Sequence, residues 1–250
     1  MRVLLLGYGK MGKVIERVAT ARNHVITARI DAHNQADMAD MAETTPPTDR
    51  RPDVAIEFSQ PDAAFANLRF CLEHGIPVVC GTTGWLGRKP EIEQLTQEKQ
   101  GAFFYASNFS IGVNLFFRLN ALLAKWMNAY PQYEVSVTEV HHTEKKDAPS
   151  GTALTLTEGL LAALKRKTAW TDQPAAAPHQ IAVHSVREGN VPGTHTIQYD
   201  SAVDQITITH AAHSREGFAL GAVLAAEWLV QQRQAGRHGV FGMEEMMDEK

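Results

Sequence analysis

The chain has 250 residues, enough for two modest domains or one large domain with a substantial core. Its 44% hydrophobic and 21% charged residues are ordinary for a globular protein. The formal charge of -4 gives no electrostatic reason to expect nucleic acid or an anionic membrane as a partner, and no apolar run approaches the roughly 20 residues that cross a bilayer. We therefore expect a cytoplasmic protein.

The cysteines, Cys71 and Cys80, both stand among apolar residues. Such surroundings favour packing over chemistry. We expect buried free thiols rather than a disulfide or a metal pair, which agrees with a reducing compartment.

A glycine-rich loop follows the first predicted strand, the continuous apolar run at residues 1–6. A helix is predicted from residue 10 to 20. In this context the first glycine permits a tight turn, the second lets a pyrophosphate approach the backbone, and the third allows close packing of helix on strand. We interpret the loop as a dinucleotide site, with a purely structural glycine loop as the alternative. Its residues are Gly7, Tyr8, Gly9, Lys10, Met11 and Gly12.

Asp31 ends the second predicted strand, where a carboxylate would hydrogen-bond the adenosine ribose hydroxyls. Ala32 and His33 follow it, so no Arg or Lys stands next in the chain to meet a 2′-phosphate. This favours NADH over NADPH as the cofactor. Lys10 and Arg29 are the nearby cations that could instead reach a 2′-phosphate.

Alternation of strands with helices continues to residue 105, which predicts an α/β fold with a doubly wound parallel sheet. The polar residues 34–52 are predicted as a loop. Further strands are predicted at residues 53–58, 76–80 and 102–105, with helices at residues 63–74 and 90–100.

Ligands of such sheets bind at the carboxyl ends of the strands. Two loops follow strands there, and we expect them to meet the nicotinamide half of the cofactor; ordinary turns are the alternative. They contain Gly81, Thr82 and Thr83 in one loop, and Ala106, Ser107, Asn108 and Phe109 in the other.

The second half of the chain predicts an α+β domain, with a sheet of about four strands in which neighbours are connected by hairpins. One exposed face of that sheet would need covering, and self-association is a common solution. Residues 169–178 are predicted as a connection. The strands are expected at residues 134–140, 181–187, 194–199 and 204–210, and the helices at residues 111–130, 152–165 and 218–234.

Residues 139–153 bring together more candidate proton donors and anion-binding groups than any other stretch of the chain. His141 and His142 leave a strand end toward opposite faces. Ser150 is a natural N-cap, so the N–H groups that follow it form a place for a carboxylate or phosphate near Lys145. Those N–H groups belong to Gly151, Thr152 and Ala153.

Two other interpretations of the histidines remain. One is a core histidine beside a surface one, which the downstream turn disfavours. The other is zinc, since Glu139 and His141 share a strand face, but no third ligand has convincing spacing. We therefore predict no metal site.

Together these motifs resemble the 4-hydroxy-tetrahydrodipicolinate reductase (dihydrodipicolinate reductase) family over essentially the whole chain. The run of residues 141–152 is far more specific than the glycine-rich loop. The resemblance rests on residues 7–12, 81–84, 106–110, 139–142, 145, 147–153, 185–187 and 193–195.

The resemblance implies a dinucleotide-binding domain at residues 1–108 and a substrate-binding and tetramerisation domain at residues 109–216. Residues 217–250 would form a C-terminal helix and tail that return to the first domain. It also implies a homotetramer and hydride transfer from NAD(P)H to a small cyclic unsaturated dicarboxylate, giving tetrahydrodipicolinate.

The same resemblance implies roles for individual residues. His141 and Lys145 would donate protons, which suits an imidazole and an ammonium. The substrate carboxylates would be held by His142, Ser150, Gly151 and Thr152. Glu144 stands where many relatives carry a basic residue, which leaves substrate affinity open but not the reaction type.

Two other classes of function remain to be weighed. Another two-domain NAD-dependent oxidoreductase would usually place a different Lys or His set in the second domain. A non-catalytic dinucleotide sensor would need the cofactor loops but not residues 141–153.

Overall fold

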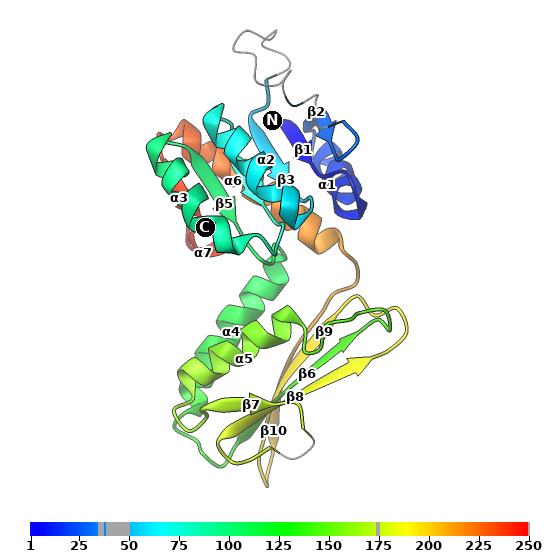
Figure 1. The fold of residues 1–250 in the computed structure, drawn as a ribbon. Helices are drawn as coiled ribbons and strands as arrows, with labels where there is room; N and C mark the ends of the chain where they lie inside the picture. Colours follow the sequence, from blue (N-terminus) through cyan, green and yellow to red (C-terminus); the bar gives the residue numbers. More distant parts are fainter. Residues whose placement is uncertain (35–37, 39–50, 174–175, 250) are drawn as a thin grey trace. The chain divides into compact units, whose positions relative to one another are not determined.

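The computed structural model describes residues 1–34, 38, 51–173 and 176–249, and it divides the chain into two compact units (Figure 1). Unit 1 combines Met1–Ser110 with Glu216–Lys250, and unit 2 is Ile111–Arg215. The C-terminal segment therefore shares a unit with the N-terminal sheet. The loop predicted at residues 34–52 lies for the most part outside the described residues.

Within the described residues, unit 1 contains a six-stranded, all-parallel sheet in the order β11-β5-β4-β3-β1-β2. This confirms the doubly wound α/β prediction. The edge strand β11 lies where the sequence indicated only a tail. The strands are β1 (Arg2–Leu6), β2 (Val25–Ile30), β3 (Val54–Glu57), β4 (Val78–Cys80), β5 (Ala102–Tyr105) and β11 (Gly239–Phe241).

Helices lie on both faces of this sheet. The connection through α1 moves from β1 to β2, whereas those through α2 and α3 move the opposite way along the sheet, and right-handed crossovers then place them on opposite faces. Helix α6 packs against α1. The helices are α1 (Lys10–Ala21), α2 (Pro61–Glu73), α3 (Lys89–Glu98), α6 (Glu216–Gln234) and α7 (Met243–Asp248).

The core of unit 1 explains why its strands are continuous apolar runs. Leu4, Ala55, Val78 and Phe103, from four neighbouring strands, are fully buried in one cluster. A strand covered by helices on both faces has no polar side, so an alternating pattern is absent.

Both cysteines are buried free thiols, as predicted. Burial raises the pKa of the Cys80 thiol, which keeps it unreactive.

Unit 2 is a mixed sheet covered on one face by two helices (Figure 1). Among the described residues the sheet has five strands in the order β10-β9-β6-β8-β7. Helices α4 (Ile111–Met127) and α5 (Gly151–Ala163) pack on it through a shared core. The strands are β6 (Glu134–His141), β7 (Ala169–Thr171), β8 (Gln180–Arg187), β9 (Thr194–Asp200) and β10 (Gln205–Ala211).

The expected four hairpin-connected strands were wrong in two respects. The short strand β7 lies where a connection was predicted, and β6 lies between β8 and β9, parallel to the former and antiparallel to the latter. The chain after β8 crosses the end of β6 instead of turning back on itself, since the Glu188 N–H donates to His141 O and the His142 N–H donates to Val191 O, both at 2.8 Å. The strands β9 and β10 do pair as consecutive antiparallel neighbours.

No helix among the described residues combines the length and the apolar character needed to span a membrane.

Candidate functional site

A cavity of about 300 Å³ lies at the carboxyl ends of β1, β2 and β3 in unit 1. Four of the predicted cofactor residues line it, namely Gly7, Tyr8, Gly9 and Asp31. Phe58, Ser59 and Gln60 also line it, although the sequence did not predict them as cofactor residues. These residues follow β3, so the rule that ligands bind at strand ends contained the signal for them.

The glycines of this loop meet distinct steric demands. Gly7 has φ +95°, and a Cβ there would lie 2.1 Å from the Phe58 carbonyl oxygen. A Cβ at Gly12 would lie 2.2 Å from the Gly7 carbonyl oxygen, whereas one at Gly9 would meet nothing within 4 Å. The first and third glycines therefore hold the loop against the sheet, and the second leaves open space at the start of α1, where backbone N–H groups favour an anion.

A second cavity in unit 1, of about 280 Å³, is lined by more of the predicted residues: Met11, Gly81, Thr82 and Thr83. The Ser59 N–H donates to Thr82 Oγ1 at 2.8 Å, which ties the loop after β3 to the loop after β4.

Six predicted cofactor residues line neither of these two cavities. Lys10 is exposed on α1, and Gly12 lies buried beneath the loop. Ala106 donates its N–H to Cys80 O at 3.3 Å, and Asn108 Oδ1 accepts the Ser110 N–H at 2.9 Å. Ser107 is exposed, and Phe109 is buried with its ring centroid 5.5 Å from that of Phe58. In this structure the loop after β5 is thus partly a packing element.

Asp31 lines the cavity, whereas Arg29 is paired with another side chain. Asp31 Oδ1 accepts the His33 N–H at 2.8 Å, while its side chain lines the larger cavity. The Arg29 guanidinium is paired with Glu16, with Nε at 3.0 Å from Oε2, and it lies 5.8 Å from the centroid of the Tyr8 ring. The Tyr8 hydroxyl also donates to Glu16. The hydrogen bond from Arg29 lowers the pKa of the Glu16 carboxyl, so this carboxylate is ionised at neutral pH.

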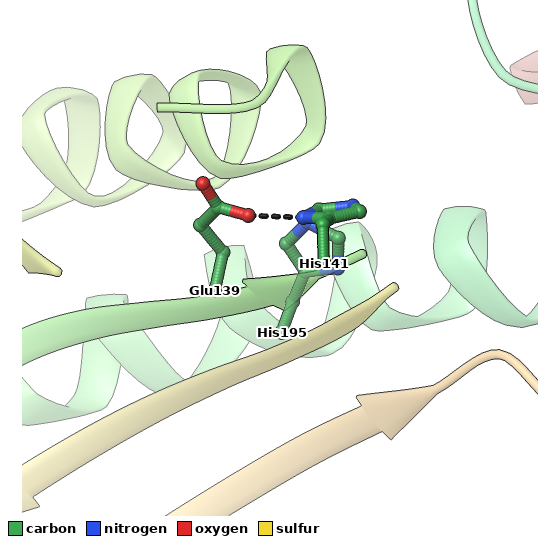
Figure 2. Close-up of side chains that lie close together, drawn as sticks. All are labelled: Glu139, His141 and His195. Carbon is green, nitrogen blue, oxygen red and sulfur yellow. Dashed lines mark hydrogen bonds and ion pairs between the residues drawn. The ribbon is translucent and has the colours of Figure 1, made fainter. Parts of the chain in front are cut away.

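In unit 2 the end of β6 brings Glu139 and His141 together, as Figure 2 shows. They are two residues apart on a strand and so share a face. Glu139 Oε2 and His141 Nδ1 form a hydrogen bond. His195 joins them from β9, where it lies opposite Glu139 in the register, with its ring centroid 5.1 Å from that of His141.

Glu139 is a fully buried carboxylate. Burial by itself would raise its pKa, but interactions with Arg187, Ser185 and His141 outweigh burial, so the pKa is lowered. Arg187 Nη2 lies 3.0 Å from Glu139 Oε1 in an ion pair. The group is therefore ionised at neutral pH, and it occupies a site that excludes water.

The two ring nitrogens of His141 have different neighbours: Nδ1 contacts the Glu139 carboxylate, and Nε2 lies against the backbone of Gly193. Burial lowers the pKa of the His141 imidazole; Glu139 opposes this shift, whereas Lys145 and Arg187 add to it. Because Nδ1 meets a carboxylate, the neutral ring carries its proton there and leaves Nε2 as the acceptor. A Cβ at Gly193 would lie 2.9 Å from Nε2, so only a glycine leaves room for the ring at this position.

Lys145 is held by a partner that the sequence analysis did not weigh. Its Nζ donates to both carboxylate oxygens of Asp147, at 2.8 and 2.9 Å. Lys145 lowers the pKa of the Asp147 carboxyl. Arg187 Nη2 donates to Asp147 O at 2.6 Å, which fastens this loop to the end of β8. The spacing Lys-x-Asp was the available signal.

Ser150 is the N-cap of α5, as predicted: its Oγ accepts the Ala153 N–H at 3.2 Å. The expected trio of open N–H groups was therefore wrong for Ala153. Gly151 is exposed and Thr152 half-buried at the start of the helix. His142 is half-buried and bound to the neighbouring loop through its backbone.

The structure adds a third potential metal ligand that sequence spacing did not indicate. Glu139, His141 and His195 offer ligand atoms that all lie within 4.8 Å of one another. Sequence spacing could not reveal this, because His195 reaches the group through strand pairing. Two of the nitrogens already have hydrogen-bond partners, and the Arg187 cation lies 3.0 Å from the carboxylate. These contacts favour a hydrogen-bonded network over a resident cation.

Comparisons with known proteins cover both units. The family model described as dihydrodipicolinate reductase, N-terminus, matches residues 1–109, and the one described as dihydrodipicolinate reductase, C-terminus, matches residues 112–247. The chain is 44% identical over 249 residues to the 4-hydroxy-tetrahydrodipicolinate reductase of Christiangramia forsetii, covering 100% of this chain and 98% of the relative. The enzyme of that name from Lawsonia intracellularis is 33% identical over 258 residues, which cover 95% of this chain and 96% of the relative.

A solved structure has the same architecture. It is the dipicolinate-bound dihydrodipicolinate reductase from a Paenisporosarcina species, with a TM-score of 0.74, 22% identity and 97% of both chains covered. At this identity the likeness establishes the fold alone.

Proposed function

The chain belongs to the dihydrodipicolinate reductase family, and we propose on this premise that it reduces 4-hydroxy-tetrahydrodipicolinate/dihydrodipicolinate to tetrahydrodipicolinate. The reaction is an NAD(P)H-dependent step of lysine and diaminopimelate biosynthesis. The observation that carries the proposal is the full-length family match. The placement of His141, Lys145 and Ser150 around the ends of β6 and α5 supports it.

Unit 1 binds the nicotinamide cofactor through the loops that line its cavities. When bound, the cofactor supplies the hydride. We propose that NADH is preferred, because Asp31 lies in the cavity beside His33 whereas Arg29 is paired with Glu16. An anionic side chain in that position accepts the ribose hydroxyls and repels a 2′-phosphate.

Unit 2 binds the dicarboxylate and supplies the proton. Reduction of a conjugated imine adds the hydride to one carbon and a proton to another atom of the conjugated system. His141 and Lys145 act as the proton donors. His142, Ser150, Gly151 and Thr152 hold the carboxylates, with the N-terminus of α5 favouring negative charge.

A dianionic substrate also changes the state of His141. The Lys145 and Arg187 cations lower the pKa of the free imidazole, and a bound dicarboxylate offsets their charge. Binding therefore favours the imidazolium, which is the form that donates a proton.

We further propose a homotetramer assembled through unit 2. Its sheet exposes apolar side chains, with Val186 at 40% and Ile206 at 38% exposure, and the β9–β10 turn exposes Val203 at 86%. A sheet that is covered by helices on one face has such a surface available for self-association. Light scattering on the purified protein tests the tetramer. The expected cytoplasmic location stays a prediction.

The reaction is tested by following NADH and NADPH oxidation while a dihydrodipicolinate synthase generates the substrate from pyruvate and aspartate semialdehyde. Oxidation that depends on the synthase supports the proposal, and the ratio of the two cofactors tests the preference for NADH. Cofactor binding without oxidation would favour a sensor. Turnover only with a different substrate would favour another oxidoreductase.

A further inference from the structure

We propose that Glu139 is a positioning residue that fixes the tautomer and the orientation of His141, and that Arg187 keeps Glu139 in place for this purpose. The inference rests on the proposed role of His141 as a proton donor. It gives a role to the buried Glu139 carboxylate, which takes no direct part in the proposed reaction.

The first support is the geometry of the pair. Glu139 Oε2 and His141 Nδ1 are hydrogen-bonded, and both side chains come from the same strand (Figure 2). A carboxylate at Nδ1 places the imidazole proton on that nitrogen and directs Nε2 away from it. Gly193 lies against Nε2, where even a methyl group would crowd the ring. The ring is thus held at Nδ1 by the carboxylate, and a glycine leaves room for it beside Nε2.

The second support is the way the carboxylate is itself held. Glu139 has no exposed surface, and a buried charge needs a partner. Arg187 supplies it from β8 at 3.0 Å. The same guanidinium also donates to Asp147 O, so one cation connects the Glu139–His141 pair with the loop that carries Lys145. The positions of both proposed proton donors therefore depend on Arg187.

The third support is the charge around His141. The groups that act on it are Glu139 on β6, Lys145 in the loop after β6 and Arg187 on β8. The neighbouring ring of His195 on β9 is acted on in turn by His141 and by His210 on β10. Glu139 is the anion of this set, and the others are cations or neutral rings. The Glu139 charge therefore opposes the loss of the His141 proton before the transfer step.

The two nitrogens of His141 therefore have different roles. His141 exchanges its proton through Nε2, while the other proton stays on Nδ1, hydrogen-bonded to the Glu139 carboxylate. When Nε2 is protonated, Glu139 stabilises the imidazolium; after transfer, it keeps the neutral ring in the tautomer that can be reprotonated at Nε2.

The test is Glu139→Gln, which keeps the shape of the side chain and an oxygen that accepts from Nδ1 but removes the charge. We expect kcat to fall about tenfold or more, with KM changed less than about threefold and with the apparent pKa of the acid in the kcat profile shifted downward. Glu158→Gln is the matched control, because Glu158 is an exposed carboxylate on α5 of the same unit. It should leave kcat, KM and the pH profile unchanged.

A merely structural ion pair between β6 and β8 would give a different outcome. It would lower thermal stability while leaving the pH profile of kcat where it is in the wild type. That result, or wild-type kcat in Glu139→Gln, would overturn the proposal.

A measurement on the unmodified protein keeps the proposal testable if Glu139→Gln fails to fold. Nitrogen NMR of the 11 histidines at neutral pH, with His141 assigned by the signal lost in His141→Gln, reports the tautomer directly. We expect a ring protonated at Nδ1, and a ring protonated at Nε2 would contradict the proposal. This readout needs no substrate, so it separates failure of the positioning role from failure of the proposed reaction.

Discussion

Ser150 Oγ lies 3.0 Å from His195 Nε2, and both side chains are buried. Burial lowers the pKa of His195 to about 4, so the ring is neutral at physiological pH. Ser150 Oγ already accepts the Ala153 N–H. When Nε2 also donates to this oxygen, both acceptor positions of the hydroxyl are used, and its own proton is available to donate to a further acceptor.

The first prediction concerns this pair. His195→Phe removes the donor to Ser150 and frees the hydroxyl to turn, so we expect KM for the dicarboxylate to rise about tenfold, the effect of one charge-assisted hydrogen bond. His195→Gln, which retains an N–H donor, should recover part of the loss. His184→Gln is the control, because His184 is an exposed histidine on β8. An unchanged KM in His195→Phe would show that Ser150 does not need its neighbour.

The second prediction concerns Lys145. Lys145→Ala should lower kcat about 10²-fold or more, the usual effect of losing a positioned acid. NADH binding, measured by fluorescence titration, should stay at the wild-type value because the cofactor residues belong to unit 1. Lys146→Ala removes the same charge from the exposed neighbouring residue and serves as the control. Wild-type turnover in Lys145→Ala would exclude this residue from the chemistry.

The third prediction concerns cofactor choice. Glu16→Gln weakens the ion pair with Arg29, which leaves a guanidinium available next to Tyr8, a residue that lines the cavity. We expect the ratio of kcat/KM for NADPH to that for NADH to rise several-fold, which corresponds to the free energy of about one exposed ion pair. The double variant Glu16→Gln with Arg29→Ala should return the ratio to its starting value. If the ratio rises equally without Arg29, another cation binds the phosphate.

The fourth prediction concerns stability and pH. Glu227 on α6 is paired with Arg22, with Nε at 2.7 Å, and with His24. The hydrogen bond from Arg22 lowers the pKa of Glu227 below its ordinary value of 4.5. A lowered pKa in the folded state contributes stability above the unfolded pKa and loses it as pH falls through the folded one.

Glu227→Gln should therefore reduce the free energy of unfolding by about 1 kcal/mol at pH 7, a modest value because the pair is partly exposed. The difference from wild type should shrink as the pH falls below about 4.5. Urea denaturation across that pH range measures it, and a difference independent of pH would assign the loss to packing instead.

Local sequence signals were sufficient for much of the fold and part of the site. The apolar run before Gly7 predicted a central strand because both of its faces are covered, and the side chain of Ser150 identified the start of α5. Such features depend on a few consecutive residues. They can be inferred without knowing the tertiary structure.

The rest depends on contacts between distant residues. His195 joins Glu139 because β9 pairs with β6, and Arg187 reaches the same carboxylate because β6 lies between β8 and β9. Hairpin rules predicted a different neighbour for β8. The pairing of Arg29 with Glu16 is likewise invisible in a motif, although it bears on the predicted cofactor preference.

The most direct test of the proposed reaction follows the hydride itself. NADH carrying deuterium at the transferable position of its nicotinamide is mixed with enzyme and freshly generated substrate, and the tetrahydrodipicolinate is analysed by mass spectrometry. We expect one deuterium in the product, at a carbon, with none acquired when deuterium is supplied at the other face of the nicotinamide ring. A product without deuterium from either cofactor, or no product from wild-type enzyme with bound NADH, would contradict the assignment.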